Sequence, residues 1–143
     1  MQLFIQSLYT FSSWKMYNWS MFFFRILVSI ELIIAHGLKK IGVGVAEAEH
    51  IPNPLHFSDT FNNGFAIAAN LFFPCFVILG FCTRLAALPT LAVTLTGLFV
   101  VHWHGTPLEK DTPFMYSLVF LLIAVLGPGK YSVDNYLYKK FSR

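Results

Sequence analysis

The sequence predicts an all-helical integral membrane protein, built as an antiparallel bundle of four membrane-spanning helices. The chain of 143 residues is 56% hydrophobic and only 12% charged. Soluble domains carry roughly 25% charged residues, so these charges are too few to cover a water-facing surface. The hydrophobic residues also gather in four runs, near the ~20 residues that a helix needs to cross a bilayer. The 16 Phe, 6 Tyr and 3 Trp residues are typical of side chains that meet lipid and headgroups.

The four runs and the polar stretches between them predict the topology of a single domain over residues 1–143. The runs cover residues 19–38, 64–82, 85–103 and 113–127. A polar loop with two prolines, 39–63, follows the first run, and the tight turn Cys82-Thr83-Arg84 joins the second run to the third. A second loop over 104–112 leads to the last run, which ends at Gly127-Pro128-Gly129. Such short connections make neighbouring helices antiparallel.

Both ends of the chain are expected to form amphipathic segments that lie in the membrane interface. Residues 1–18 mix aromatic and aliphatic side chains with glutamine, serine and Lys15. The tail from Tyr131 to Arg143 sets aromatic side chains against basic ones, and Ser132 stands where it can cap a helix. The net charge of +3 sits at helix ends and in this tail. Anionic lipid headgroups, and not nucleic acid, are therefore the expected partners of the basic residues.

The distribution of basic residues predicts that both termini lie in the cytoplasm, because cytoplasmic segments carry the excess of Lys and Arg. One side of the expected bundle holds Lys15, Arg84, Lys130, Lys139, Lys140 and Arg143. The other side holds Lys39, Lys40 and Lys110. The loops 39–63 and 104–112 are therefore expected to face away from the cytoplasm. The same side receives all five histidines of the chain: His36, His50, His56, His102 and His104.

Polar side chains at membrane depth mark functional or bundle-interior positions, because each costs several kcal/mol when it faces lipid. Arg25, Ser29, His36 and Lys39 share one face of the first helix, so this face should point into the bundle. Function and snorkelling to the cytoplasmic headgroups are both open as explanations for the arginine.

Glu31 is the deepest carboxylate and lies about 120° away from the polar face of its own helix. A charged carboxylate facing lipid there would cost about 3 kcal/mol. We therefore expect it to contact another helix or a partner subunit, or to be buried in its neutral form. Tyr116, Ser117 and Thr94 are the candidate donors on neighbouring helices.

The second and third helices each carry one unusual pattern. Pro74 removes the N–H that would bond the carbonyl of Asn70, so a side-chain amide and a free carbonyl occur at one depth. A plain proline kink is the alternative interpretation. In the third helix, Thr90, Thr94 and Gly97 form a stripe of small residues, which lets another helix approach closely.

His102-Trp103-His104 lies at the end of the third run, where His36 and Asp111 are also expected. These groups could hold a metal ion or a quinone headgroup. The H-x-H spacing points its two side chains to different faces of a helix, so it is not distinctive of a metal site, and histidines that simply face water are favoured over metal ligands. We expect Arg25, His36, Asn70 and His104 to line one interior cavity. The predicted ligand-binding residues are Arg25, Glu31, His36, Asn70, His102, His104 and Asp111; no metal site and no catalytic residue are assigned.

Three motifs together resemble the DoxX family of small four-helix membrane proteins. They are Arg25-x10-His36-Gly37-x-x-Lys40, Leu79-Gly80-x-x-Thr83-Arg84-Leu85-Ala86-Ala87 and Gly127-Pro128-Gly129-Lys130-Tyr131-Ser132-Val133-Asp134. The last motif is the most specific, and the resemblance covers residues 22–137. One departure is Asn70, which stands where many members carry a glutamate and which cannot titrate.

The resemblance implies an integral membrane subunit of a respiratory or thiol redox system in the inner membrane of a bacterium. It makes quinone the candidate ligand of a polar pocket on the extracytoplasmic side, and the sequence has no motif for haem, flavin or nucleotide. Other membrane subunits, or further copies of the chain, are the expected protein partners. Two alternatives stay open: a non-catalytic assembly or scaffold subunit of a larger membrane complex, and a small transporter.

Overall fold

The structure, a computed structural model, describes residues 14–142, and every regular element in this range is helical. The predicted all-helical class is therefore confirmed. Most of the amphipathic segment expected over residues 1–18 falls outside the described residues. The part that is described, from Trp14 onwards, already belongs to the first long helix.

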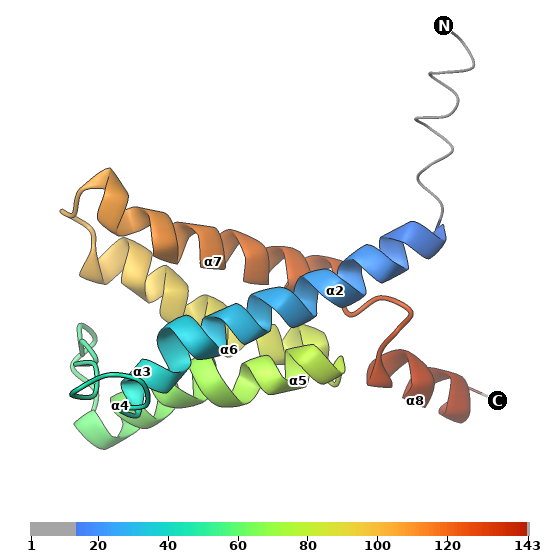
Figure 1. Cartoon of the computed structure of the whole chain (residues 1–143), viewed down its shortest axis with the longest axis horizontal. Helices are drawn as coiled ribbons and strands as arrows, with labels where there is room; N and C mark the ends of the chain where they lie inside the picture. Colours follow the sequence, from blue (N-terminus) through green and yellow to red (C-terminus); the bar gives the residue numbers. More distant parts are fainter. Residues whose placement is uncertain (1–13, 143) are drawn as a thin grey trace, which may run out of the picture.

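Four long helices make up the body of the protein, and a short one follows (Figure 1). The first consists of α2 (Trp14–Leu32), the π-helical turn η1 (Ile33–Gly37) and α3 (Leu38–Lys40). The second consists of α4 (Asp59–Ile67), the π turn η2 (Ala68–Phe72) and α5 (Phe73–Leu79). The third consists of α6 (Thr83–Thr96) and the π turn η3 (Gly97–Val101). The fourth is α7 (Pro107–Leu126), and the short one is α8 (Val133–Phe141).

Three of the long helices are long and apolar enough to cross a membrane: Met16–Lys40, Asp59–Leu79 and Thr83–Val101. The fourth helix, α7, has comparable length, but Glu109, Lys110 and Asp111 lie in its first turns. These charges stand at the end of the helix, where polar headgroups can solvate them, and the rest of α7 from Pro113 to Leu126 is largely apolar.

Backbone conformation explains where the helices end. The second apolar run continues to Cys82, but α5 stops at Leu79 because Gly80 adopts the left-handed conformation (φ 72°). Gly127 ends α7 in a different conformation (φ 78°, ψ −171°), whose positive φ also favours glycine. Thr106 begins α7, and its backbone N–H donates a hydrogen bond to the Glu109 carboxylate (3.0 Å).

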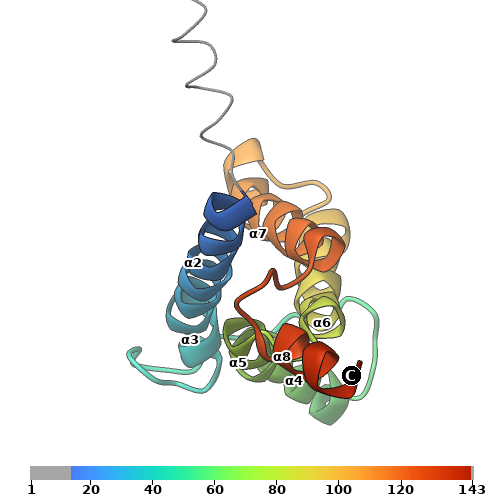
Figure 2. The ribbon, with the colours of Figure 1, turned by 90° about the vertical axis from the view of Figure 1, so that its right-hand side faces the viewer.

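The long helices pack in the order α2, α5, α6, α7 around the bundle, as the end-on view shows (Figure 2). Their shared core consists of Leu32, Val77, Ala86, Ala87, Phe120 and Ile123, all buried. In Figure 1, α2 and α7 come together towards the end that carries α8 and diverge towards the opposite end, where the loops 41–58 and 102–106 lie. The two ends of the bundle therefore differ: one is closed by the chain itself, and the other is splayed.

The segment 127–132 closes the end that carries α8 (Figure 2). The backbone N–H of Lys130 donates to the Asn18 side chain (2.9 Å). Arg25, only 1% exposed, donates from Nη2 to the carbonyl of Tyr131 and from Nη1 towards that of Val77 (3.5 Å). Arg25 thus does not snorkel to the headgroups; it joins α2 to the segment after α7.

Asp134, the last residue of the most specific motif, caps the N-terminus of α6. Its carboxylate accepts hydrogen bonds from the backbone N–H of Cys82 (2.6 Å), from that of Thr83 (3.0 Å) and from the Thr83 hydroxyl (3.1 Å). Its own N–H donates to the carbonyl of Gly80 (2.9 Å). A carboxylate placed at helix N–H groups is favourable, because those groups have no partner within the helix. Ser132 caps α8 as predicted, since its Oγ accepts from the N–H of Asn135 (3.1 Å).

Candidate functional site

A cavity of about 570 Å³ lies within the splayed end of the bundle. Its lining comes from all four long helices and from the loop over residues 49–57, so it lies between the helices and is partly open to the outside. Ligand sites in proteins usually enclose about 300–1,000 Å³ and combine apolar walls with a few polar groups. The apolar wall is built from Leu32, Ile51, Leu55, Phe57, Phe61, Phe65, Val93 and Val101, among others.

Each of the first three long helices has a π-helical turn at the cavity. His36 lies in η1, Asn70 in η2 and Gly97 in η3, and all three line the space. A π turn adds one residue to a helical turn, widens the helix and occurs often at functional sites. The turns η1 and η2 contact each other, and all three turns contribute residues to the cavity, which indicates that the helices are shaped around it.

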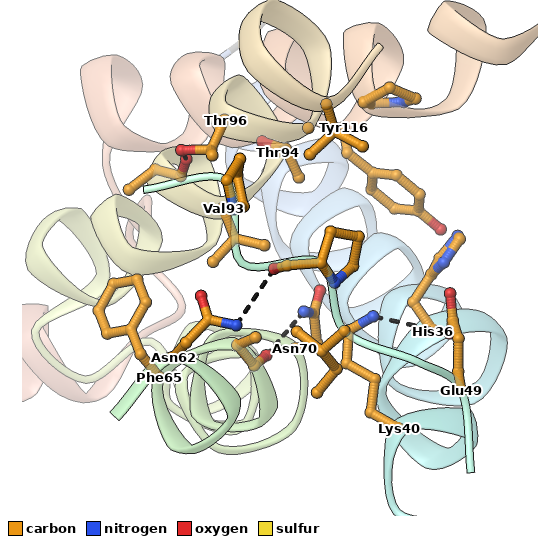
Figure 3. A pocket seen from close by; sticks show the side chains of 18 of the residues that line it. His36, Lys40, Glu49, Asn62, Phe65, Asn70, Val93, Thr94, Thr96 and Tyr116 are labelled. Atoms are coloured by element: carbon orange, nitrogen blue, oxygen red, sulfur yellow. Dashed lines mark hydrogen bonds and ion pairs between the residues drawn. The ribbon is translucent and has the colours of Figure 1, made fainter. Parts of the chain in front are cut away.

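The side chains of His36 and Tyr116 point toward one another at the cavity (Figure 3), and among the described residues they lack the protein partners that most of its other polar side chains have. The rings of His36 and Tyr116 meet edge to face, with centroids 5.3 Å apart and planes at 90°. Within residues 14–142, neither the imidazole nitrogens of His36 nor the Tyr116 hydroxyl makes a hydrogen bond. Asn70, 3% exposed, donates from Nδ2 to the carbonyl of Ala66 (2.8 Å), and no described residue donates to its Oδ1.

Gly37 sets the distance between the first and second long helices beside the cavity. A Cβ atom at this position would lie 2.5 Å from the carbonyl oxygen of Asn70 and 2.9 Å from Cγ of Leu71. This is the carbonyl that Pro74 leaves without its helical donor, and it sits in the π turn η2. As predicted, the amide side chain of Asn70 occurs together with irregular backbone. Because Gly37 also packs against this backbone, the feature is more than a plain proline kink.

The loop after α3 covers the outer side of the cavity. Lys40 and Glu49 form an ion pair (3.6 Å), and the backbone N–H of Glu49 donates to the carbonyl of Lys39 (3.0 Å). Further along, Asn62 Nδ2 donates to the carbonyl of Pro52 (3.1 Å). The dashed lines in Figure 3 mark the contacts of Asn62 and of Lys40. The loop is thus tied to two different helices across the space that it covers.

Comparison with known proteins identifies the family of this chain. A family model described as DoxX matches residues 20–103, more than half of the chain. The chain belongs to the DoxX family. A second model, described as TQO small subunit DoxD, matches residues 64–143 of this DoxX-family protein; TQO stands for thiosulfate:quinone oxidoreductase. Inner membrane protein YqjF of Escherichia coli (strain K12) is 36% identical over 130 residues, which cover 82% of this chain and 91% of that protein. No solved structure matches the chain.

The cavity brings together some of the predicted ligand-binding residues of this DoxX-family protein and leaves out others. His36, Asn70 and His102 line it. Arg25 lies at the closed end, and His104 is exposed and is not part of the lining. The expectation that Arg25 and His104 share one cavity with His36 and Asn70 is therefore wrong. Arg25 precedes His36 by eleven residues, about 16 Å of helix, so a common face does not bring them to a common depth.

Glu31 and Asp111 lie in a separate groove of about 560 Å³ between α2 and α7. Glu31 is exposed, and no described residue forms a hydrogen bond or an ion pair with its carboxylate. Two of the expected donors are engaged with each other, since Ser117 Oγ donates to Thr94 Oγ1 (2.9 Å). The prediction of a donor on a neighbouring helix is thus not met within residues 14–142, and a partner subunit remains the predicted contact.

Sequence reasoning missed the aromatic wall and the covering loop. Phe57, Phe61 and Phe65 follow one another at intervals of four, which puts Phe61 and Phe65 on one face of α4, and this spacing was the available signal. Tyr116 was considered only as a partner of Glu31. Among the described residues, no group of three His, Cys, Asp or Glu side chains is placed to hold a metal ion.

Proposed function

We propose that this DoxX-family protein is a membrane subunit of a bacterial redox system and that its cavity binds the headgroup of a quinone. The observation that carries the proposal is the unpartnered pair of His36 and Tyr116 inside a largely apolar cavity of about 570 Å³. A quinone headgroup is a flat ring with carbonyl oxygens that accept hydrogen bonds. An imidazole N–H and a phenol O–H are donors of the kind it needs, and apolar walls suit its ring.

The match to the DoxD family supports the same chemistry, because its description names the small subunit of a thiosulfate:quinone oxidoreductase. Reduction of a quinone to a quinol takes up two electrons and two protons. We propose that a partner subunit delivers the electrons, while His36 and Tyr116 lie where they can transfer protons to the oxygens of the ligand. Other membrane proteins are thus the proposed partners, and the bacterial inner membrane is the proposed location, as for the E. coli relative.

Quinone binding is tested on protein purified from native membranes in mild detergent, by extracting its quinones and quantifying them chromatographically. We expect about one quinone per chain in the wild type. His36→Leu and Asn70→Leu should each lower that occupancy, and the affinity for added quinone should fall about tenfold, the effect of losing about 1.4 kcal/mol of polar contact.

The matched controls are His104→Leu and Asn63→Leu, which remove the same side chains outside the cavity and should leave quinone binding unchanged. Cavity variants that bind as much quinone as the wild type would contradict the proposal. A stable larger complex that co-purifies without any quinone would support the alternative of an assembly or scaffold subunit.

The proposed orientation puts the covering loop outside the cytoplasm and α8 inside it. Glu47→Cys, at an exposed loop position with no side-chain hydrogen bond, should react with a membrane-impermeant maleimide in spheroplasts. Lys139→Cys should react only after lysis. Both variants need a Cys75→Ser, Cys82→Ser background, because the two native thiols are exposed. The reverse labelling pattern would show that the chain is inserted the other way round.

A further inference from the structure

The groove between α2 and α7 adjoins the cavity. His36, Thr112 and Tyr116 line both spaces, so the edge-to-face ring pair stands at their junction. Away from this junction the groove is walled by Leu27 and Val28 of α2 and by Met115 and Val119 of α7. The exposed carboxyl groups of Glu31 and Asp111 complete its lining.

The groove reaches much deeper into the membrane than the mouth of the cavity does. Leu27 lies thirteen residues before the end of the span at Lys40, about 20 Å along the helix, and is 64% exposed. A hydrocarbon core is about 30 Å thick, so this position lies well inside it. On the water side, the tied loop over residues 49–57 covers the cavity. The space therefore opens towards lipid along the line where α2 and α7 diverge (Figure 1).

We propose that the groove between α2 and α7 binds the isoprenoid tail of the quinone whose headgroup occupies the cavity, and that the ligand enters from the bilayer along this groove. The inference rests on the proposed function. It adds where the tail of the ligand lies and how the ligand enters. An amphiphile of this kind needs a polar-donor pocket joined to an apolar channel at hydrocarbon depth. His36 and Tyr116 line both the cavity, where they can donate, and the adjoining groove, whose walls are mostly apolar away from Glu31 and Asp111.

A competing route would pass between α4 and η3, whose residues Phe61 and Val101 also line the cavity. Phe61 lies in the first turn of α4, and Val101 is the last residue of η3, so this route is at the ends of both helices. A tail that left there would emerge near the headgroups instead of the hydrocarbon interior. Because the groove between α2 and α7 reaches hydrocarbon depth and the other route does not, the groove is the favoured path for the tail.

The test measures the binding of two radiolabelled benzoquinones, one with a decyl tail and one without a tail, to the full chain in lipid nanodiscs. Met115→Trp should obstruct the groove, whereas Leu118→Trp places the same ring on the lipid-facing side of the same helix; the two native side chains are 49% and 52% exposed. We expect Met115→Trp to slow association of the tailed probe about tenfold. The tail-less probe should bind both variants and the wild type equally at equilibrium.

A second matched pair repeats the comparison from α2, so the result does not depend on one variant folding. Leu27→Trp should act like Met115→Trp, and Ile34→Trp, at a position of similar exposure outside the groove, should act like the wild type. If groove variants bind the tailed probe as fast as the wild type, or if Val101→Trp alone slows it, the groove proposal is overturned while quinone binding stands. If neither probe binds the wild type, the proposed function fails and the groove proposal falls with it.

Discussion

Gly80→Ala is expected to abolish stable assembly of the closed end of the bundle. Gly80 has φ 72°, a conformation that costs a residue with a Cβ atom about 1–2 kcal/mol. The added Cβ would also overlap Nη1 of Arg25 and would lie 2.6 Å from Cβ of Ser132. Arg25 is buried and held at Tyr131, so it cannot move aside cheaply. The measurement is the unfolding temperature and monodispersity of the purified protein in detergent.

The matched control for this prediction is Gly64→Ala. Gly64 lies inside α4, and a Cβ atom there would meet nothing within 4 Å. Alanine is favoured over glycine in a helix by roughly 0.5–1 kcal/mol, so the control should be as stable as the wild type or more stable. Equal unfolding temperatures for Gly80→Ala and the wild type would show that the closed end does not depend on this close approach.

Arg25→Leu is expected to release the segment 127–132 and α8 from the bundle. The leucine would leave the carbonyl of Tyr131 without its donor, and a buried carbonyl without a partner costs about 1–3 kcal/mol. The measurement is limited proteolysis of the protein in detergent, read as the rate of cleavage between residues 127 and 142. We expect this rate to rise at least tenfold. The cleavage rate of Arg25→Lys should lie between those of the wild type and Arg25→Leu, because an ammonium group lacks the forked set of donors of a guanidinium.

Lys39→Leu provides the control for Arg25→Leu, because it removes an exposed basic residue from the other end of the same helix. In Lys39→Leu, the chain between residues 127 and 142 should be cleaved at the wild-type rate. Wild-type protection of α8 in Arg25→Leu would mean that the bonds of Asp134 to Cys82 and Thr83 and the bond of Lys130 to Asn18 hold the tail without Arg25. That result would refute the structural role assigned to Arg25.

The helices could be predicted from the sequence, because burial in lipid requires long apolar runs and leaves few other interpretations. The cap at Ser132 also followed from local chemistry. The turn predicted at Cys82-Thr83-Arg84 was misplaced, because the left-handed Gly80 already ends α5 and α6 begins at Thr83. The partners of Arg25 could not be predicted. A polar stripe shows which face of a helix points into the bundle, but it does not show how far along the helix two residues lie from each other. Arg25 and His36 therefore share a face although they lie towards opposite ends of the bundle.

The candidate site could be predicted only in part. His36, Asn70 and His102 were recognised as residue types that are costly in a membrane. The three π turns were not foreseen, because each depends on packing against other helices and changes the direction of every later side chain in its helix. The role of Asp134 was hidden for a related reason: its carboxylate caps a helix that starts 51 residues earlier in the chain.

The bond between Arg25 and Tyr131 has a consequence for how the protein is made. Its two residues are 106 positions apart, and those of the bond between Asn18 and Lys130 are 112 apart. At about 5–20 residues per second, a ribosome needs roughly 5–20 s to reach the acceptor after it has made the arginine. Arg25 therefore lacks this acceptor, though not that of Val77, until the last long helix has been translated. A nascent chain that stops before Tyr131 already contains the four long helices of the described residues, yet it lacks the contacts that close one end of the bundle.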